Sequence, residues 1–88
     1  MTKITTTNGF ILVKEELKVI LNIIRAAWDS CDDFIPLTAM KYNYNTKVHD
    51  EQSFYINRNS IHLINEIDDE ELEEIIYNGD ELFWSRRN

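Results

Sequence analysis

Residues 15–30, EELKVILNIIRAAWDS, predict the main helix of the protein. Apolar side chains recur along this segment at the spacing of one helix face, and they are Leu17, Ile20, Leu21, Ile24, Ala27 and Trp28. The segment opens with two glutamates, which the helix dipole favours in a first turn. We therefore expect a long amphipathic helix over residues 15–30 that turns this face to the core.

Three further apolar residues of the same segment, Val19, Ile23 and Ala26, lie off this main face. They widen the apolar arc beyond the single stripe that one contact surface needs. Either another element of the same chain covers them, or a second subunit does. A homo-oligomer formed through Val19 and Ile23 is therefore one of the two interpretations.

Before the helix, the sequence predicts a β-hairpin over residues 4–13. Threonines and β-branched residues, which favour strands, flank the dipeptide Asn8-Gly9. A two-residue hairpin loop that matches the twist of the strands needs positive φ at both central positions, and Asn-Gly tolerates this best. We expect Asn8 and Gly9 to be the two loop residues.

After the helix, alternating apolar and polar residues predict two strands, at 40–44 and 53–57, with a polar loop over 45–50. Tyr55 falls on the opposite side of the second strand. We expect the remaining apolar side chains of the two strands to pack together in the core, namely Met40, Tyr42, Tyr44, Phe54 and Ile56. Residues 61–64 predict a third strand, with a short helix as the alternative.

A second helix is predicted near the carboxyl end of the chain. Asp68, with Glu71 three residues later, has the spacing of a capping box. Asn78-Gly79 is a typical helix end. The buried face of this helix is expected to contain Leu72, Ile75 and Ile76. The predicted fold is α+β, with an N-terminal hairpin, one long helix, a small antiparallel sheet and an acidic C-terminal helix in a single domain over residues 1–88.

The charge of the chain is strongly negative and unevenly distributed. The formal net charge is −7, with +1 over residues 1–49 and −8 over residues 50–88. Between Glu66 and Glu81 there are nine carboxylates and no basic residue. Because a solvated helix usually mixes signs for pairing at i, i+4, this one-sided run points to an electrostatic role.

On the predicted second helix, Glu70, Glu73, Glu74 and Tyr77 fall opposite the apolar face, and Glu66 and Glu81 flank them. Side chains three or four residues apart on a helix lie about 5–6 Å apart, of the order of the phosphate spacing of a nucleic-acid strand. Such a row of carboxylates could occupy a basic groove built for DNA or RNA. The alternative is a solvated face that only keeps the protein soluble.

Trp84 is the other candidate for contact with a partner, because tryptophan is over-represented at interface hot spots. The alternative is that Trp84 closes one end of the core. The candidate partner-binding residues are therefore Glu66, Glu70, Glu73, Glu74, Tyr77, Glu81 and Trp84.

No catalytic or metal-binding motif is recognisable in the chain. Cys31, His49 and His62 form neither a CxxC nor an HExxH pattern, and the acidic run does not have the spacing of a calcium loop. We expect no enzyme activity, no metal and no cofactor. A lone cysteine forms no internal disulfide, and the longest apolar run, residues 10–13, is too short to span a membrane. We therefore expect a cytoplasmic protein.

The interpretation that follows is a small acidic protein that acts through its surface. The negative charge disfavours direct binding of nucleic acid, since that affinity depends on neutralising phosphates. We expect an inhibitor or modulator of a basic, nucleic-acid-handling protein, encoded by a phage or plasmid and acting as a DNA mimic. The alternatives are a self-assembling protein that binds a small ligand and an immunity protein against a bacteriocin or toxin.

Overall fold

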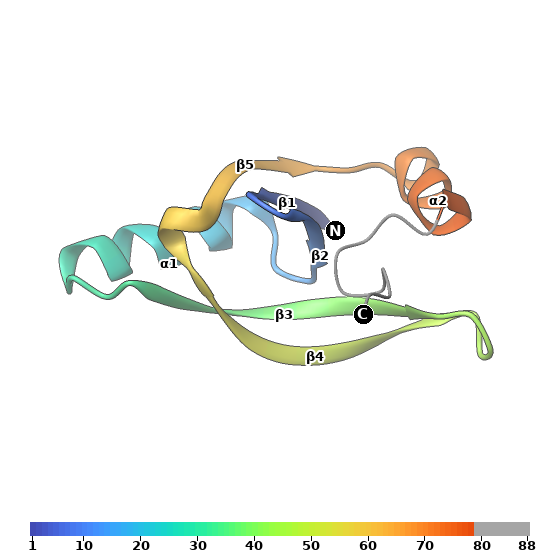
Figure 1. Ribbon diagram of the computed structural model, residues 1–88, viewed down its shortest axis with the longest axis horizontal. Helices are drawn as coiled ribbons and strands as arrows, with labels where there is room; N and C mark the ends of the chain where they lie inside the picture. The colour runs from blue at the N-terminus through green and yellow to red at the C-terminus, as the bar shows by residue number, and fades with distance from the viewer. Residues whose placement is uncertain (79–88) are drawn as a thin grey trace.

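The computed structural model of the protein describes residues 1–78. Its elements are β1 (Thr2–Thr6), β2 (Gly9–Val13), α1 (Leu17–Asp29), β3 (Phe34–Asn43), β4 (Val48–Asn57), the 3-10 turn η1 (Arg58–Ser60), β5 (Ile61–Glu66) and α2 (Asp69–Asn78). The five strands form one antiparallel sheet in the order β4-β3-β2-β1-β5 (Figure 1). The α+β class is confirmed, although both helices are short.

Helix α1 contributes Ile20 and Ala27 to a core that is otherwise built from the strands. The buried strand residues of this core are Ile4, Ile11, Val13, Ile35, Leu37, Ala39 and Ile56. Ile23 and Ile24 pack against the same cluster and are half-buried. The predicted helix face is therefore wrong at two positions, because Leu21 is 47% exposed and Trp28 is 67% exposed. The side of α1 that faces the core is rotated toward Ile23 relative to the predicted face.

The N-terminal hairpin is present, but its loop is one residue earlier than predicted. Thr6 lies opposite Gly9, so the two loop residues are Thr7 and Asn8. The Thr6 hydroxyl donates to the Gly9 carbonyl at 3.0 Å and accepts from the Asn8 amide at 3.3 Å. Gly9 has a φ of 147°, a conformation that glycine adopts readily because it has no Cβ.

Strand β3 begins at Phe34, six residues before the predicted strand, and it includes Pro36. The amide of Arg58 donates to the Asp33 carbonyl, so Asp33 directs its backbone groups toward the β4 side. Backbone groups alternate in direction along a strand, so the odd-numbered residues of β3 face β4. Even-numbered residues of β3 therefore direct their backbone groups away from β4. Strand β2 pairs with β3 only at Val13 and Ala39, so the missing N–H of Pro36 faces no strand.

Two residues further along β3, the outward amide of Thr38 is satisfied by a side chain. Glu15 accepts from the Thr38 amide through Oε1 and from the Thr38 hydroxyl through Oε2, both at 2.9 Å. The segment between β2 and α1 is thereby attached to β3. This carboxylate replaces the strand neighbour that β3 lacks at this point.

We expect Glu15→Ala to lower the free energy of unfolding by about 1.5–3 kcal/mol, because it removes a charged acceptor from a part-buried amide. Glu15→Gln retains an amide group that can bond both Thr38 groups, so its loss should be smaller. Urea unfolding followed by circular dichroism measures both values. Equal stability of the wild type and Glu15→Ala would contradict this role.

Strand β4 begins at Val48, so the predicted polar loop over residues 45–50 is wrong in its second half. Leu37 lies opposite Phe54, whereas Met40 lies opposite Glu51. Because residues that face each other across a ladder share one side of the sheet, Met40 is on the side away from Phe54 and Ile56. Tyr42 is on that same side, and Tyr44, in the turn, is 53% exposed. The prediction that Met40, Tyr42 and Tyr44 pack with Phe54 and Ile56 in one core is therefore wrong.

Residues 61–66 form β5, which confirms a strand there and excludes the short helix. The cap of α2 is also confirmed, since the Glu71 amide donates to Asp68 Oδ1 at 2.8 Å. Ile75 is buried, and Leu72 and Ile76 are half-buried. Neither helix within residues 1–78 has the length and apolar character needed to cross a bilayer.

Candidate functional site

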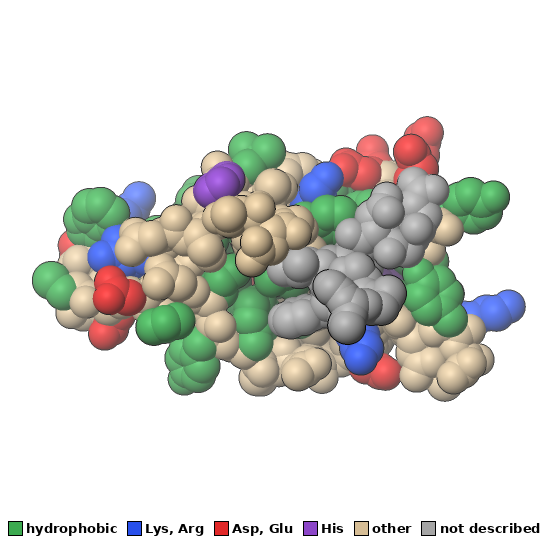
Figure 2. Space-filling model, viewed as in Figure 1, with side chains coloured by type: hydrophobic (Ala, Val, Ile, Leu, Met, Phe, Trp, Pro, Cys, Tyr) green, Lys and Arg blue, Asp and Glu red, His purple; other side chains and the backbone are tan. Residues whose placement is uncertain are grey.

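The candidate site is the outer surface of α2. Glu70, Glu73 and Glu74 are exposed on this helix, and Tyr77 is 90% exposed. Figure 2 shows acidic side chains gathered over the end of the molecule where α2 lies. The helix carries no lysine or arginine between Asp69 and Asn78. Its solvent-facing side is therefore anionic.

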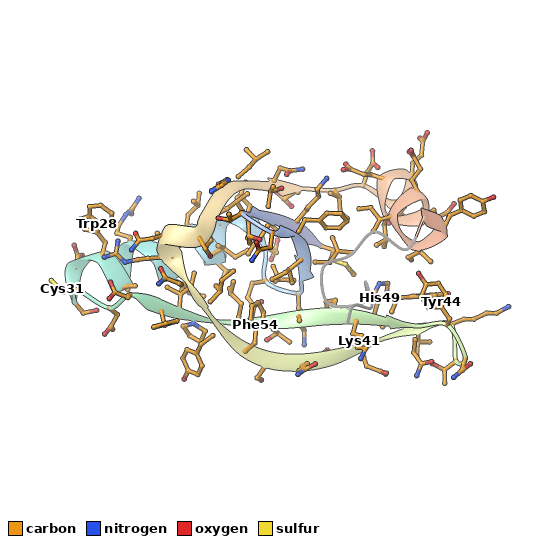
Figure 3. The ribbon with its side chains drawn as sticks, viewed as in Figure 1. Trp28, Cys31, Lys41, Tyr44, His49 and Phe54 are labelled. Atoms are coloured by element: carbon orange, nitrogen blue, oxygen red, sulfur yellow. The ribbon has the colours of Figure 1, made fainter. Side chains whose placement is uncertain are left out.

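Contacts with distant segments of the chain hold α2 at both ends. Near its start, Lys3 Nζ lies 3.6 Å from Glu71 Oε2, and the Ile67 amide donates to the Met1 carbonyl at 3.1 Å. Near its end, the Tyr44 hydroxyl donates to the Ile76 carbonyl at 2.8 Å. Figure 3 shows Tyr44 at the far end of the β3–β4 hairpin, next to α2. These contacts fix the position of α2 relative to the sheet and to the β3–β4 hairpin.

Between α2 and strands β1 and β2 there is an open hollow of about 550 Å³. It is lined by Lys3, Phe10, Asp68, Glu70, Glu71, Glu74 and Ile75. Lys3 Nζ is also 4.9 Å from the centroid of the Phe10 ring. Four carboxylates against one ammonium leave the hollow negative. A lysine or arginine side chain entering it would meet carboxylates, beside Lys3, which already lies over the Phe10 ring.

The structure brings together only some of the predicted partner-binding residues. Glu70, Glu73, Glu74 and Tyr77 share α2, as predicted. Glu66 is exposed but ends β5, and α2 begins at Asp69, so Glu66 does not continue the helix face. Glu81 and Trp84 lie outside the described residues.

Sequence reasoning missed Lys3, Phe10 and Tyr44 as neighbours of α2. Lys3 and Phe10 are more than fifty residues from α2 in the chain, and Tyr44 is 32 residues from Ile76. No periodicity within the helix carries a signal for such partners. A period of two does carry one signal. Lys3 precedes buried Ile4 and Phe10 precedes buried Ile11, so Lys3 and Phe10 face the side of the sheet opposite to those two isoleucines.

The three residues considered for nucleophilic or metal chemistry are on separate elements. Cys31 is exposed just beyond α1, His49 is in β4, and His62 is in β5 at the other edge of the sheet. Cys31 and His49 lie toward opposite ends of the molecule (Figure 3). Within residues 1–78, no group of three or more histidine, cysteine, aspartate or glutamate side chains is placed to hold a metal ion.

His49 has an unusual environment among these three. Its ring packs against Tyr42 with centroids 5.1 Å apart, and its buried Nε2 has no hydrogen-bond partner among the described residues. Burial removes water from the imidazole and lowers the pKa of His49 below its ordinary value of 6.5. The fold therefore favours the neutral form.

Because the unfolded chain binds the His49 proton more readily, the stability of the fold should decrease as the pH falls below about 6.5. We expect His49→Gln, which does not titrate, to lose less unfolding free energy than the wild type between about pH 7 and pH 5.5. Every other titratable group is common to the two proteins, so the difference between the two slopes isolates His49. Parallel slopes in urea unfolding would contradict the lowered pKa.

Comparison of the chain with protein-family models, with curated proteins and with solved structures finds no match. Functional conclusions therefore rest on the chain's own geometry and charge. The strongest candidate for a functional site within residues 1–78 is the anionic surface of α2 with its adjoining hollow.

Proposed function

We propose that the protein is a non-enzymatic inhibitor or modulator that binds a basic, nucleic-acid-handling protein through α2. The observation that carries this proposal is the row of exposed carboxylates, Glu70, Glu73 and Glu74, on a helix fixed at both ends. Like charges at this spacing repel one another, which costs about 0.2–0.5 kcal/mol per pair. A basic groove removes that repulsion and gains favourable contacts in its place.

The surroundings of the carboxylates support contact with a protein. The hollow beside α2 presents the carboxylates of Glu70 and Glu74 to a basic side chain, while Lys3 already lies over Phe10. Tyr77, 90% exposed, provides an aromatic contact on the same helix. Tyrosine is enriched among the residues that carry binding energy at interfaces. Charge then directs the encounter, and Tyr77 adds short-range attraction.

The test is competition with nucleic acid. The protein is immobilised, partners are captured from a host lysate at low salt, and the main partner is purified. We expect it to be basic, to release the protein at high salt, and to lose its DNA or RNA when the protein binds. A partner that binds nucleic acid and this protein at the same time would contradict the proposal.

Immunity against a basic toxin would use the same surface, and the capture experiment separates the two functions. A toxin, rather than a nucleic-acid-handling protein, would then be the captured partner. Self-assembly through Val19 and Ile23 has less support in the structure. Ile23 already packs against the core, and only Val19, 43% exposed, is left for a second subunit.

A further inference from the structure

Strand β4 forms one outer edge of the sheet. It has ten residues and pairs with β3 from Val48 to Asn57 without a shift in register. In the part of the chain that the structure describes, no strand pairs with its other side, and Figure 1 shows β4 at the outside of the sheet. A long, regular edge strand offers a row of backbone donors and acceptors to another strand.

A backbone hydrogen bond at the end of the hairpin shows which residues offer these groups. The Arg58 amide, directly after β4, donates to the Asp33 carbonyl, so an even-numbered residue faces β3 there. Because backbone groups alternate in direction along a strand, the even residues of β4 face β3 and the odd residues face outward. The outward row consists of residues 49, 51, 53, 55 and 57. Its middle member is Ser53.

We propose that the protein forms a homodimer in which β4 pairs antiparallel with β4 of a second copy, around a two-fold axis at Ser53. Only this register places every outward residue of one copy opposite an outward residue of the other. Asn57, whose carbonyl already accepts from the Ser60 hydroxyl at 2.8 Å, lies at the two ends of the pairing. It joins the two sheets into one across the interface, through backbone hydrogen bonds.

The distribution of charge along β4 selects a second antiparallel copy as the occupant. The carboxylates, Asp50 and Glu51, are in the first half of the strand, and the large apolar residues, Phe54, Tyr55 and Ile56, are in the second. In the proposed register, Glu51 lies opposite Tyr55 of the second copy and Asp50 lies opposite its Ile56. No carboxylate faces another. A parallel copy would align the two acidic halves, which like-charge repulsion disfavours.

The first test measures mass in solution. Sedimentation equilibrium of the full chain, from about 5 to 500 µM, should show a monomer–dimer equilibrium. Ser53→Pro removes an outward donor, a substitution that edge strands tolerate, and it should weaken dimerisation roughly tenfold or more. Ser53→Val keeps the amide and should dimerise like the wild type. Circular dichroism and urea unfolding verify that both variants fold.

A second pair of variants tests the register through charge. Tyr55 is 73% exposed, so neither glutamate nor lysine there should unfold the protein. Tyr55→Glu places a carboxylate opposite Glu51 of the second copy and should weaken dimerisation, whereas Tyr55→Lys should strengthen it, and salt should reduce both effects. Equal effects of the two variants would overturn the register.

Two results would overturn the dimer itself. One is the mass of a monomer at every concentration. The other is a dimer that survives Ser53→Pro unchanged, which would locate the contact elsewhere, as at Val19. Neither result bears on α2, because the pairing uses none of its carboxylates. The proposed function and this inference can therefore fail separately.

Discussion

Replacement of Ile20 by alanine is expected to lower the free energy of unfolding by about 2–5 kcal/mol. Ile20 is fully buried in the core beneath α1, and the substitution leaves a cavity there. Leu21→Ala, at the next position of the same helix, should cost less than about 1 kcal/mol, because Leu21 is 47% exposed. The two variants remove side chains of equal size from neighbouring helix positions, so the difference between their unfolding free energies measures the effect of burial.

The loss at Ile20 is large relative to the stability of so short a chain. Small domains bury a limited fraction of their surface and have free energies of unfolding near the low end of about 5–15 kcal/mol. We therefore expect Ile20→Ala to be substantially unfolded at 37 °C. Urea unfolding at 25 °C, monitored by circular dichroism, gives both values. A loss for Leu21→Ala as large as that for Ile20→Ala would contradict the exposed position of Leu21 and support the predicted face, which contains both residues.

Reversal of the α2 charges is expected to have the largest effect on binding. Changing Glu70, Glu73 and Glu74 together to lysine should slow association with the captured partner by about 10- to 1000-fold at low salt. The wild-type rate should itself fall as salt is added, because ions screen the attraction. Stopped-flow or surface-based kinetics measure both effects.

The control for this experiment changes the same number of exposed carboxylates elsewhere. Glu16, Asp29 and Asp32 are exposed around the two ends of α1, and changing them to lysine alters the net charge equally. If net charge alone mattered, both triple variants would slow association alike. We expect the α2 variant to have the much larger effect. Unchanged association of the α2 variant would mean that these carboxylates are only a solvated face.

Folding should survive the α2 reversal. Glu70, Glu73 and Glu74 are exposed, so their replacement opens no cavity, and we expect the free energy of unfolding to change by less than about 1 kcal/mol. The attachments of α2 through Glu71 and Ile76 remain in this variant. A melting temperature close to that of the wild type would separate lost binding from lost structure.

The amino-acid sequence by itself determined the local elements of this protein. The cap at Asp68 depends on residues within a few positions of each other, and it agrees with the structure. The predicted helix end at Asn78-Gly79 extends beyond the described residues. The helix over 17–29, the first hairpin and the strand after Ile61 were predictable for the same reason. Hydrogen bonds between near neighbours and side-chain periodicity suffice for such elements.

Only the tertiary structure decided which apolar residues are buried. The apolar arc of α1 is wider than one stripe, so its sequence permits several rotations, and packing on the sheet chose Ile20, Ile23 and Ala27 over Leu21 and Trp28. The side of the sheet that Met40 occupies followed from its pairing with Glu51. A period of two predicts a strand but does not state its register.

The same limit applies to the surroundings of the candidate site. The row of carboxylates on α2 is a local property, so the sequence predicted it. Lys3 and Tyr44 contact α2 only because the sheet places β1 and the β3–β4 hairpin on either side of it. Such contacts join residues far apart in the chain, and their partners are chosen by the packing of whole elements rather than by any local pattern.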